Sequence, residues 1–235
     1  MIATKTYNPL IIALDVESVE KARSLIHQIG PGADFYKVGL ELYSVAGMEF
    51  VRELNKAEKK VFLDLKLYDI GETVKRATRA IVQSGVTFLT VHAVRQVVES
   101  AVEGRGSSET QILAVSVLTS FDQQDIDEQG YLMPLADLVS LRVRQSAAAG
   151  ADGIVCSPRE VAGVRSIGGP SLKLVTPGVR SAGAGAGDQK RVATPRQAIE
   201  NGADYLVIGR QVTRAEDPRA ACEQILDEIR LAVVA

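Results

Sequence analysis

The sequence predicts a (β/α)8 TIM barrel. Eight short apolar runs alternate with amphipathic helical segments, and a length of 235 residues suits eight such units. Each run is nearly continuous in apolar character, which is typical of parallel strands that helices cover on both faces. No Ser/Pro-rich or low-complexity boundary divides the chain, so we expect residues 1–235 to form a single domain. A doubly wound open sheet is the alternative, and the count of eight units favours the barrel.

The expected strands are rich in Val, Ile and Leu. They cover residues 10–15, 35–40, 60–66, 87–93, 111–119, 152–157, 172–177 and 204–210.

Capping signals define several of the helices between these strands. Ser18 is a candidate N-cap for residues 18–30, which close on the candidate C-cap Gly30. Residues 73–85 end in the same way on Gly85. The last helix is expected to start after Asp217, with Pro218 in its first turn.

Two connections are longer than the rest. Residues 120–135 are polar and follow the fifth strand, whereas residues 178–194 are rich in Gly and Ala and follow the seventh. Loops of this length are usually either disordered or functional lids.

Composition excludes several classes of protein. Hydrophobic residues make up 46% of the chain and charged residues 24%, with a net charge of −2, so we expect no nucleic-acid partner. No membrane span or signal peptide is evident, and we expect a cytoplasmic protein. We interpret Cys156 and Cys222 as small buried hydrophobic residues. Because His27 and His92 are the only histidines, we expect no metal site.

Charged residues gather where the first three expected strands end, which in a barrel is the functional face. They are Asp15, Lys37, Asp64, Lys66 and Asp69. Asp64 and Lys66 are two apart on a strand, so they should share the inner face while Leu63 and Leu65 pack outward. A stabilising buried ion pair is the alternative interpretation. Apolar replacements of buried ion pairs are often neutral or stabilising, so five such charges together favour chemistry.

The last two strands suggest a phosphate site, as in many such barrels. Gly209 lets a backbone N–H approach an anion, and Arg210 offers a planar fork of donors. Gln189 can add neutral donors. The alternative for Arg210 is a solvated arginine at a helix start, and we interpret His92 as a structural group rather than a base.

Seven motifs resemble the orotidine 5′-monophosphate decarboxylase family. They are "ALD" (13–15), "YKVG" (36–39), "DLKLYDIGETV" (64–74), "VLTS" (117–120), "TPGVR" (176–180), "GDQKR" (187–191) and "VIGRQVT" (207–213). They occur in the family's order over nearly the whole chain. One departure follows the fourth strand, where the family commonly has His-Ala-x-Gly-Gly and this chain has "HAVRQ".

The resemblance implies a catalytic TIM barrel that converts orotidine 5′-monophosphate to UMP and CO2 in de novo pyrimidine biosynthesis. It implies no metal, no organic cofactor, and a homodimer with shared active sites. Lys66 would be the general acid that protonates C6, and Asp64 would face the substrate carboxylate. Lys37, Asp64, Lys66 and Asp69 would form an alternating charged network, with Asp69 reaching the partner's site.

The same resemblance assigns the substrate contacts. Asp15 and Lys37 would hold ribose hydroxyls, completed by Asp69 and Thr73 of the partner subunit. Thr119 or Ser120 would contact the pyrimidine. The closing lid and the phosphate grip would comprise Arg180, Gln189, Gly209 and Arg210.

Two other functions stay open at this point. Mg2+-dependent sugar-phosphate decarboxylases or synthases of the same superfamily resemble the D-x-K-x-x-D segment, but they carry an acidic residue where Lys37 stands. A catalytically silent barrel that binds phosphorylated ligands is the second, and the intact Asp64/Lys66 pair weighs against it.

Overall fold

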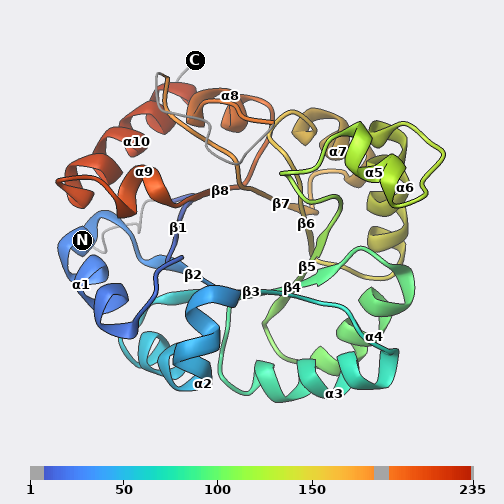
Figure 1. Cartoon of the computed structure of the whole chain (residues 1–235), viewed down its shortest axis with the longest axis horizontal. Coiled ribbons are helices and arrows are strands. Elements are labelled where there is room, and N and C mark those ends of the chain that lie inside the picture. Colours follow the sequence, from blue (N-terminus) through green and yellow to red (C-terminus); the bar gives the residue numbers. More distant parts are fainter. Residues whose placement is uncertain (1–7, 183–190, 234–235) are drawn as a thin grey trace.

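Eight parallel strands close into a barrel, in the order β1 to β8 with β8 paired to β1 (Figure 1). This computed structural model describes residues 8–182 and 191–233. Helices surround the barrel and cover the outer faces of its strands (Figure 1). The predicted TIM barrel is confirmed, and the open sheet is excluded.

All eight strands fall on the expected apolar runs. They are β1 (Leu10–Ala13), β2 (Phe35–Gly39), β3 (Lys60–Leu67), β4 (Phe88–His92), β5 (Gln111–Val115), β6 (Gly153–Val155), β7 (Lys173–Thr176) and β8 (Tyr205–Ile208). Only β3 reaches beyond its expected end, by one residue. The fifth strand stops well short of residue 119, so Thr119 and Ser120 lie in a loop.

The helices follow the strands in the alternation expected of the fold. They are α1 (Val19–Ile29), α2 (Leu40–Lys56), α3 (Gly71–Val82), α4 (Arg95–Arg105), α5 (Gln123–Glu128), α6 (Leu135–Ala148), α7 (Val161–Gly168), α8 (Pro195–Glu200), α9 (Arg210–Thr213) and α10 (Pro218–Val233), with a 3-10 turn at Gly30–Gly32. The Ser18 hydroxyl accepts a hydrogen bond from the Lys21 N–H at 3.2 Å, which confirms this N-cap. The Asp217 carboxylate likewise accepts two N–H groups of the first turn of α10, each at 3.0 Å.

The expectation for residues 120–135 needs a correction. This connection contains the helix α5, which begins at a capping box formed by Asp122 and Asp125. The expected helix over residues 73–85 also differs, because α3 begins earlier and ends at Val82, before Gly85.

The core has two layers. Between the barrel and the helices lies a continuous apolar layer that includes Leu63. Inside the barrel, Phe35, Phe62, Phe88 and Tyr205 pack ring against ring with centroids 5.1–5.9 Å apart. These rings fill the barrel interior, so the barrel is a packed core rather than a channel.

The two cysteines are buried and free, as expected. Burial raises the pKa of both thiols to about 12, which keeps them protonated and unreactive. Within residues 8–182 and 191–233, none of the helices has the length and apolar character needed to span a bilayer.

Candidate active site

A pocket of about 510 Å3 opens at the carboxyl ends of the strands. Apolar residues of the inner core, such as Phe62 and Val115, line it together with nine of the residues named from sequence. Those nine are Asp15, Lys37, Asp64, Lys66, Thr119, Ser120, Arg180, Gly209 and Arg210. Asp69 and Thr73 are not among its lining residues, and Gln189 lies outside the described residues.

Four charged side chains form an alternating chain across one wall of the pocket. The Lys37 ammonium lies 2.7 Å from an oxygen of Asp15 and 3.6 Å from an oxygen of Asp64. The Lys66 ammonium lies 2.9 Å from the other oxygen of Asp64. The side chains of Lys37 and Asp64 are only 10% and 12% exposed, so these charges depend on one another for solvation.

This mutual pairing holds the central groups ionised. Burial alone would lower the pKa of Lys37, but the carboxylates of Asp64 and Asp15 outweigh burial and raise it above its ordinary value. Burial alone would raise the pKa of Asp64, but Lys37 and Lys66 outweigh it and lower that pKa. At neutral pH the pocket therefore presents a fixed ammonium beside a fixed carboxylate.

Lys66 reaches Asp64 through an irregular backbone. Its φ of 50° is in the left-handed region, and the register of β3 against β4 shifts between Leu63 and Leu67. The pairing with Asp64 is confirmed, but the expectation that regular strand alternation produces it is wrong. A bulge redirects the Lys66 side chain at the pocket wall.

Thr90, which sequence reasoning missed, supports both members of this pair. Its fully buried hydroxyl donates to the Asp64 carboxylate at 2.9 Å and accepts the Lys66 N–H at 2.9 Å. A polar residue at a central position of the apolar run that forms β4 is the signal that could have identified it.

Gly39 is a second supporting residue. A Cβ at this position would come within 2.7 Å of the Lys37 ammonium and 3.0 Å of the Asp15 carboxylate. A side chain at this position would therefore displace the ammonium end of Lys37 from its ion pair with Asp15. Gly39 ends the motif over residues 36–39, but no local pattern in the sequence indicates its role.

Two arginines lie at the β7 and β8 side of the pocket. Burial, and then the positive charge of Arg210, lower the pKa of Arg180. An anion bound beside them would offset this repulsion. The side chain of Gln211 holds the adjoining loop, because it accepts the Ser181 N–H at 3.1 Å and donates to the Ser181 hydroxyl at 2.6 Å.

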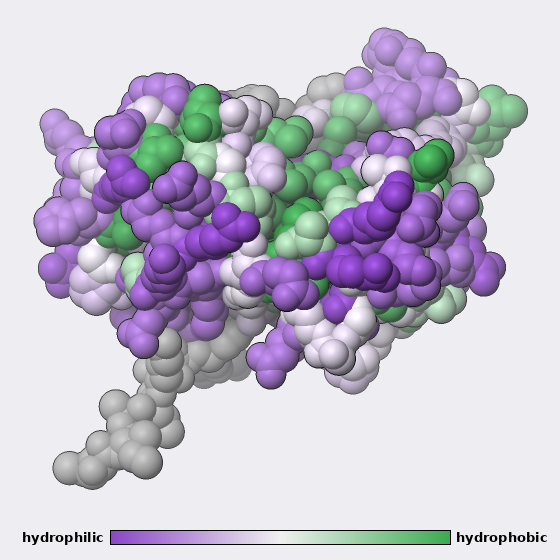
Figure 2. All heavy atoms as spheres, turned by 90° about the horizontal axis from the view of Figure 1, so that it is seen from below, coloured by the Kyte–Doolittle hydropathy of each residue, from purple (hydrophilic) through white to green (hydrophobic). Residues whose placement is uncertain are grey.

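Asp69 lies apart from the charged chain. It is exposed, and its carboxylate accepts the N–H of Ile70 at 2.6 Å. Its neighbours Tyr68 and Ile70 are 67% and 73% exposed, although both are large hydrophobic residues. Figure 2 shows the side of the molecule that carries α2 and α3, where hydrophobic residues gather between hydrophilic regions. Such an apolar surface is typical of a protein interface.

His92 lies at the edge of a second, smaller cavity, beside the ring of Tyr68 at 5.4 Å between centroids. Burial, and then the cations Arg142 and Lys66, lower its pKa. The imidazole is therefore neutral at pH 7. Among the described residues, no group of three or more His, Cys, Asp or Glu side chains is placed to hold a metal ion.

Known proteins resemble this chain over nearly its full length. The family model described as orotidine 5′-phosphate decarboxylase / HUMPS family matches residues 8–225. Two relatives named orotidine 5′-phosphate decarboxylase come from Rhodopseudomonas palustris (strain BisA53) and Methylorubrum extorquens (strain PA1). Each is 52% identical to this chain over 220 residues, which is 94% of this chain and 94% of the relative. The crystal structure of orotidine 5′-phosphate decarboxylase from Lactobacillus acidophilus is 37% identical and superposes with a TM-score of 0.83, covering 94% of this chain and 98% of that one. The chain belongs to the orotidine 5′-phosphate decarboxylase / HUMPS family.

Proposed function

We propose that this protein decarboxylates orotidine 5′-monophosphate to UMP and CO2, the last step of de novo pyrimidine biosynthesis, as one catalytic domain. The observation that carries the proposal is the Lys66 ammonium held 2.9 Å from the Asp64 carboxylate in a pocket that also contains Arg180 and Arg210. Proteins that bear this enzyme's name and are 52% identical to the chain support the same reaction.

The chemistry requires a fixed positive charge beside the reacting carbon. Loss of CO2 from C6 of the pyrimidine leaves a carbanion that the ring delocalises poorly. In this proposal no cofactor accepts the electrons, so preorganised protein charges must stabilise the carbanion. The Lys66 ammonium provides that charge and then, as general acid, donates a proton to C6.

Asp64 would lie against the carboxylate that leaves as CO2. Repulsion between the two carboxylates would be relieved as CO2 departs. This relief would lower the activation barrier, in addition to the stabilisation that Lys66 gives the carbanion. Lys37 and Asp15 would hold ribose hydroxyls, and Thr119 or Ser120 would contact the pyrimidine.

Arg180, Gly209 and Arg210, together with Gln189, would bind the phosphate. This group is remote from C6, yet its binding energy can help to position the reacting carbon and so raise the rate.

A homodimer with shared sites is part of the proposal. Asp69 lies outside its own chain's charged network and stands between two exposed hydrophobic residues, Tyr68 and Ile70. On a dimer interface, Asp69 and Thr73 of the partner subunit would complete the ribose contact. Mixing Asp69→Asn with Lys66→Ala protein should therefore restore part of the activity that each lacks, and no recovery in demonstrated heterodimers would contradict site sharing. A cytoplasmic location stays a prediction.

Turnover of orotidine 5′-monophosphate, followed as a loss of pyrimidine absorbance, tests the main proposal. We expect full turnover by the wild-type protein in the presence of EDTA. Loss of activity on chelation would favour the Mg2+-dependent sugar-phosphate enzymes of the same superfamily. No turnover with or without Mg2+ would favour a silent barrel that binds phosphorylated ligands.

A further inference from the structure

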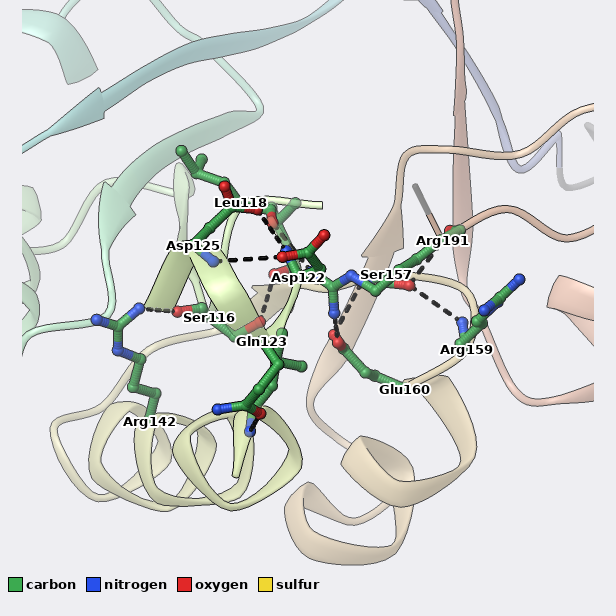
Figure 3. Close-up of polar contacts among 12 residues, drawn as sticks. Ser116, Leu118, Asp122, Gln123, Asp125, Arg142, Ser157, Arg159, Glu160 and Arg191 are labelled. Atoms are coloured by element: carbon green, nitrogen blue, oxygen red, sulfur yellow. Dashed lines mark hydrogen bonds and ion pairs between the residues drawn. The ribbon is translucent and has the colours of Figure 1, made fainter. Parts of the chain in front are cut away.

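Arg191 is a buried charged residue that does not line the pocket. It is 8% exposed and lies near the end of residues 178–194, the connection that follows β7. Its side chain lies between the loops that follow β5 and β6 (Figure 3). Any effect of Arg191 on the reaction must therefore act through the residues it contacts.

The guanidinium contacts both neighbouring loops. One terminal nitrogen donates to the carbonyl of Leu118 at 2.9 Å, and the other forms an ion pair with Glu160 (Figure 3). The second oxygen of Glu160 accepts the Ser157 N–H at 3.1 Å, and the Ser157 hydroxyl donates to the Arg191 carbonyl at 3.3 Å. Arg191 thus connects three loops at the functional end of the barrel.

These contacts lead directly to the pocket wall. Leu118 lines the pocket and immediately precedes Thr119 and Ser120, which also line it. A separate backbone bridge between Val179 and Ala193 joins the two ends of the connection that contains Arg191. The Arg191 side chain is therefore not needed to join these ends, and it binds the Leu118 carbonyl instead.

Stability alone explains this arrangement poorly. The side chains of Arg191 and Glu160 are 10% and 11% exposed, so both charges have lost most of their hydration. The Nε of Arg191 has no hydrogen-bond partner among the described residues. Apolar residues of similar volume often replace such a pair without loss of stability.

We propose that Arg191 is a positioning residue for the reaction. Because Arg191 binds both the Leu118 carbonyl and Glu160, it fixes the position of Thr119 and Ser120, one of which is the proposed contact to the pyrimidine of the substrate. This inference rests on the proposed decarboxylation, and it adds a residue that acts on the reaction without contacting the substrate.

The test uses the double variant Arg191→Met/Glu160→Met, which removes both charges and leaves neither buried alone. A shift of about 1 Å in a positioning group can lower the rate roughly 100-fold, and we expect a fall in kcat of that order. Competitive inhibition by inorganic phosphate, which reports on the proposed phosphate-binding residues such as Arg180 and Arg210, should fall far less than kcat. A purely structural role for Arg191 would not separate these two measurements.

The matched control removes a comparable pair at the opposite end of the barrel, through Arg165→Met/Asp204→Asn. The Arg165 guanidinium also binds a carboxylate and backbone carbonyls, but it lies at the amino ends of the strands, away from the pocket. We expect the control to lower the melting temperature and to leave kcat unchanged. If the Arg191 double variant does not fold, the single variant Glu160→Gln, which keeps the side-chain shape, should still lower kcat.

The outcomes separate the two proposals. If the wild type turns over the substrate and the folded Arg191 double variant has an unchanged kcat, the positioning role alone is overturned. Where the double variant does not fold, an unchanged kcat in Glu160→Gln has the same consequence. A loss of phosphate inhibition as large as the loss of kcat would also overturn it, since the damage would then lie at the phosphate end. Absence of wild-type turnover would sink the proposed function and this inference with it.

Discussion

The two ends of the barrel use ion pairs in different ways. At the amino end, Arg165 pairs with Asp204 at 2.6 Å and also donates to backbone carbonyls. The same Asp204 oxygen accepts the N–H of Leu174 in β7 at 2.7 Å. Arg105 and Asp152 form a second ion pair at this end, and Asp152 accepts the N–H of Ile112 in β5 at 2.8 Å. Each pair thereby joins a helix, a strand and the residue that precedes a later strand.

At the carboxyl end, the charged side chains of the pocket wall contact mainly one another. Asp15, Lys37, Asp64 and Lys66 alternate in sign along the pocket wall, and Thr90 is the neutral residue that supports them. Few backbone groups take part, and the ammonium of Lys66 faces a pocket large enough for a ligand.

The ion pairs at the amino end serve the stability of the fold, whereas those of the pocket wall serve its function. The pairs at the amino end satisfy backbone groups and hold the elements of the fold together, so their loss should lower the free energy of unfolding. A chain of charges that satisfy one another beside a cavity keeps its donors and acceptors available to a substrate. We therefore expect variants at the two ends to separate activity from stability.

The largest expected effect is that of Lys66→Ala on turnover. Removing both the charge that stabilises the carbanion and the general acid should lower kcat by about 10^4-fold or more. UMP should still bind measurably, because the phosphate and ribose contacts remain. Lys21→Ala, an exposed lysine on α1, is the control, and near-normal turnover by Lys66→Ala would refute the role.

The opposite behaviour is expected of Arg165→Met. This change removes the positive charge that pairs with Asp204 and the donor of three backbone carbonyls. It should lower the free energy of unfolding by about 2–3 kcal/mol. Urea unfolding measures the loss. Well below the melting temperature, kcat should equal that of the wild type, and a parallel loss of kcat would remove the distinction between the two ends.

Gly39→Ala tests the pocket end without removing a charge. The new methyl group would displace the flexible end of Lys37, which we expect to lower kcat/KM about 10-fold with little change in stability. Gly163→Ala, where a Cβ meets nothing within 4 Å, is the control. Equal activity in the two variants would show that the Lys37–Asp15 geometry does not matter.

The smallest expected effect is on the pH dependence of stability. The pKa of Asp64 is lowered from 3.8, so its ionisation stabilises the fold above that pH, and this contribution is lost as pH falls through the lower folded value. The pKa of Lys37 is raised from 10.5, so its contribution is lost only as pH rises through the higher folded value. Between these limits, stability measured by urea unfolding should show no step from this pair. A step near pH 7 that disappears in Asp64→Asn would contradict the assignment.

Much of the fold could be predicted from the sequence, because nearly continuous apolar runs mark parallel strands whatever their tertiary neighbours. The pocket residues at the strand ends followed from the same pattern, since carboxyl ends meet on one face of a barrel. The helix α5 was missed because Asp122 and Asp125 look like ordinary loop residues until their reciprocal hydrogen bonds form. The role of Thr90 depends on Asp64 and Lys66 of the neighbouring strand. The role of Gly39 depends on where the side chains of Lys37 and Asp15 meet, and the bulge at Lys66 depends on the register with β4. No local pattern carries that information.

The free energy of unfolding of Lys66→Ala tests most directly the claim that the charged chain at the carboxyl end is kept for chemistry. Asp64 keeps Lys37 and Thr90 as partners in this variant, and the Lys66 side chain is already 29% exposed. We therefore predict that urea unfolding gives a value within about 1 kcal/mol of the wild type, in the same sample that has lost turnover. A loss of stability as large as that of Arg165→Met would contradict the account.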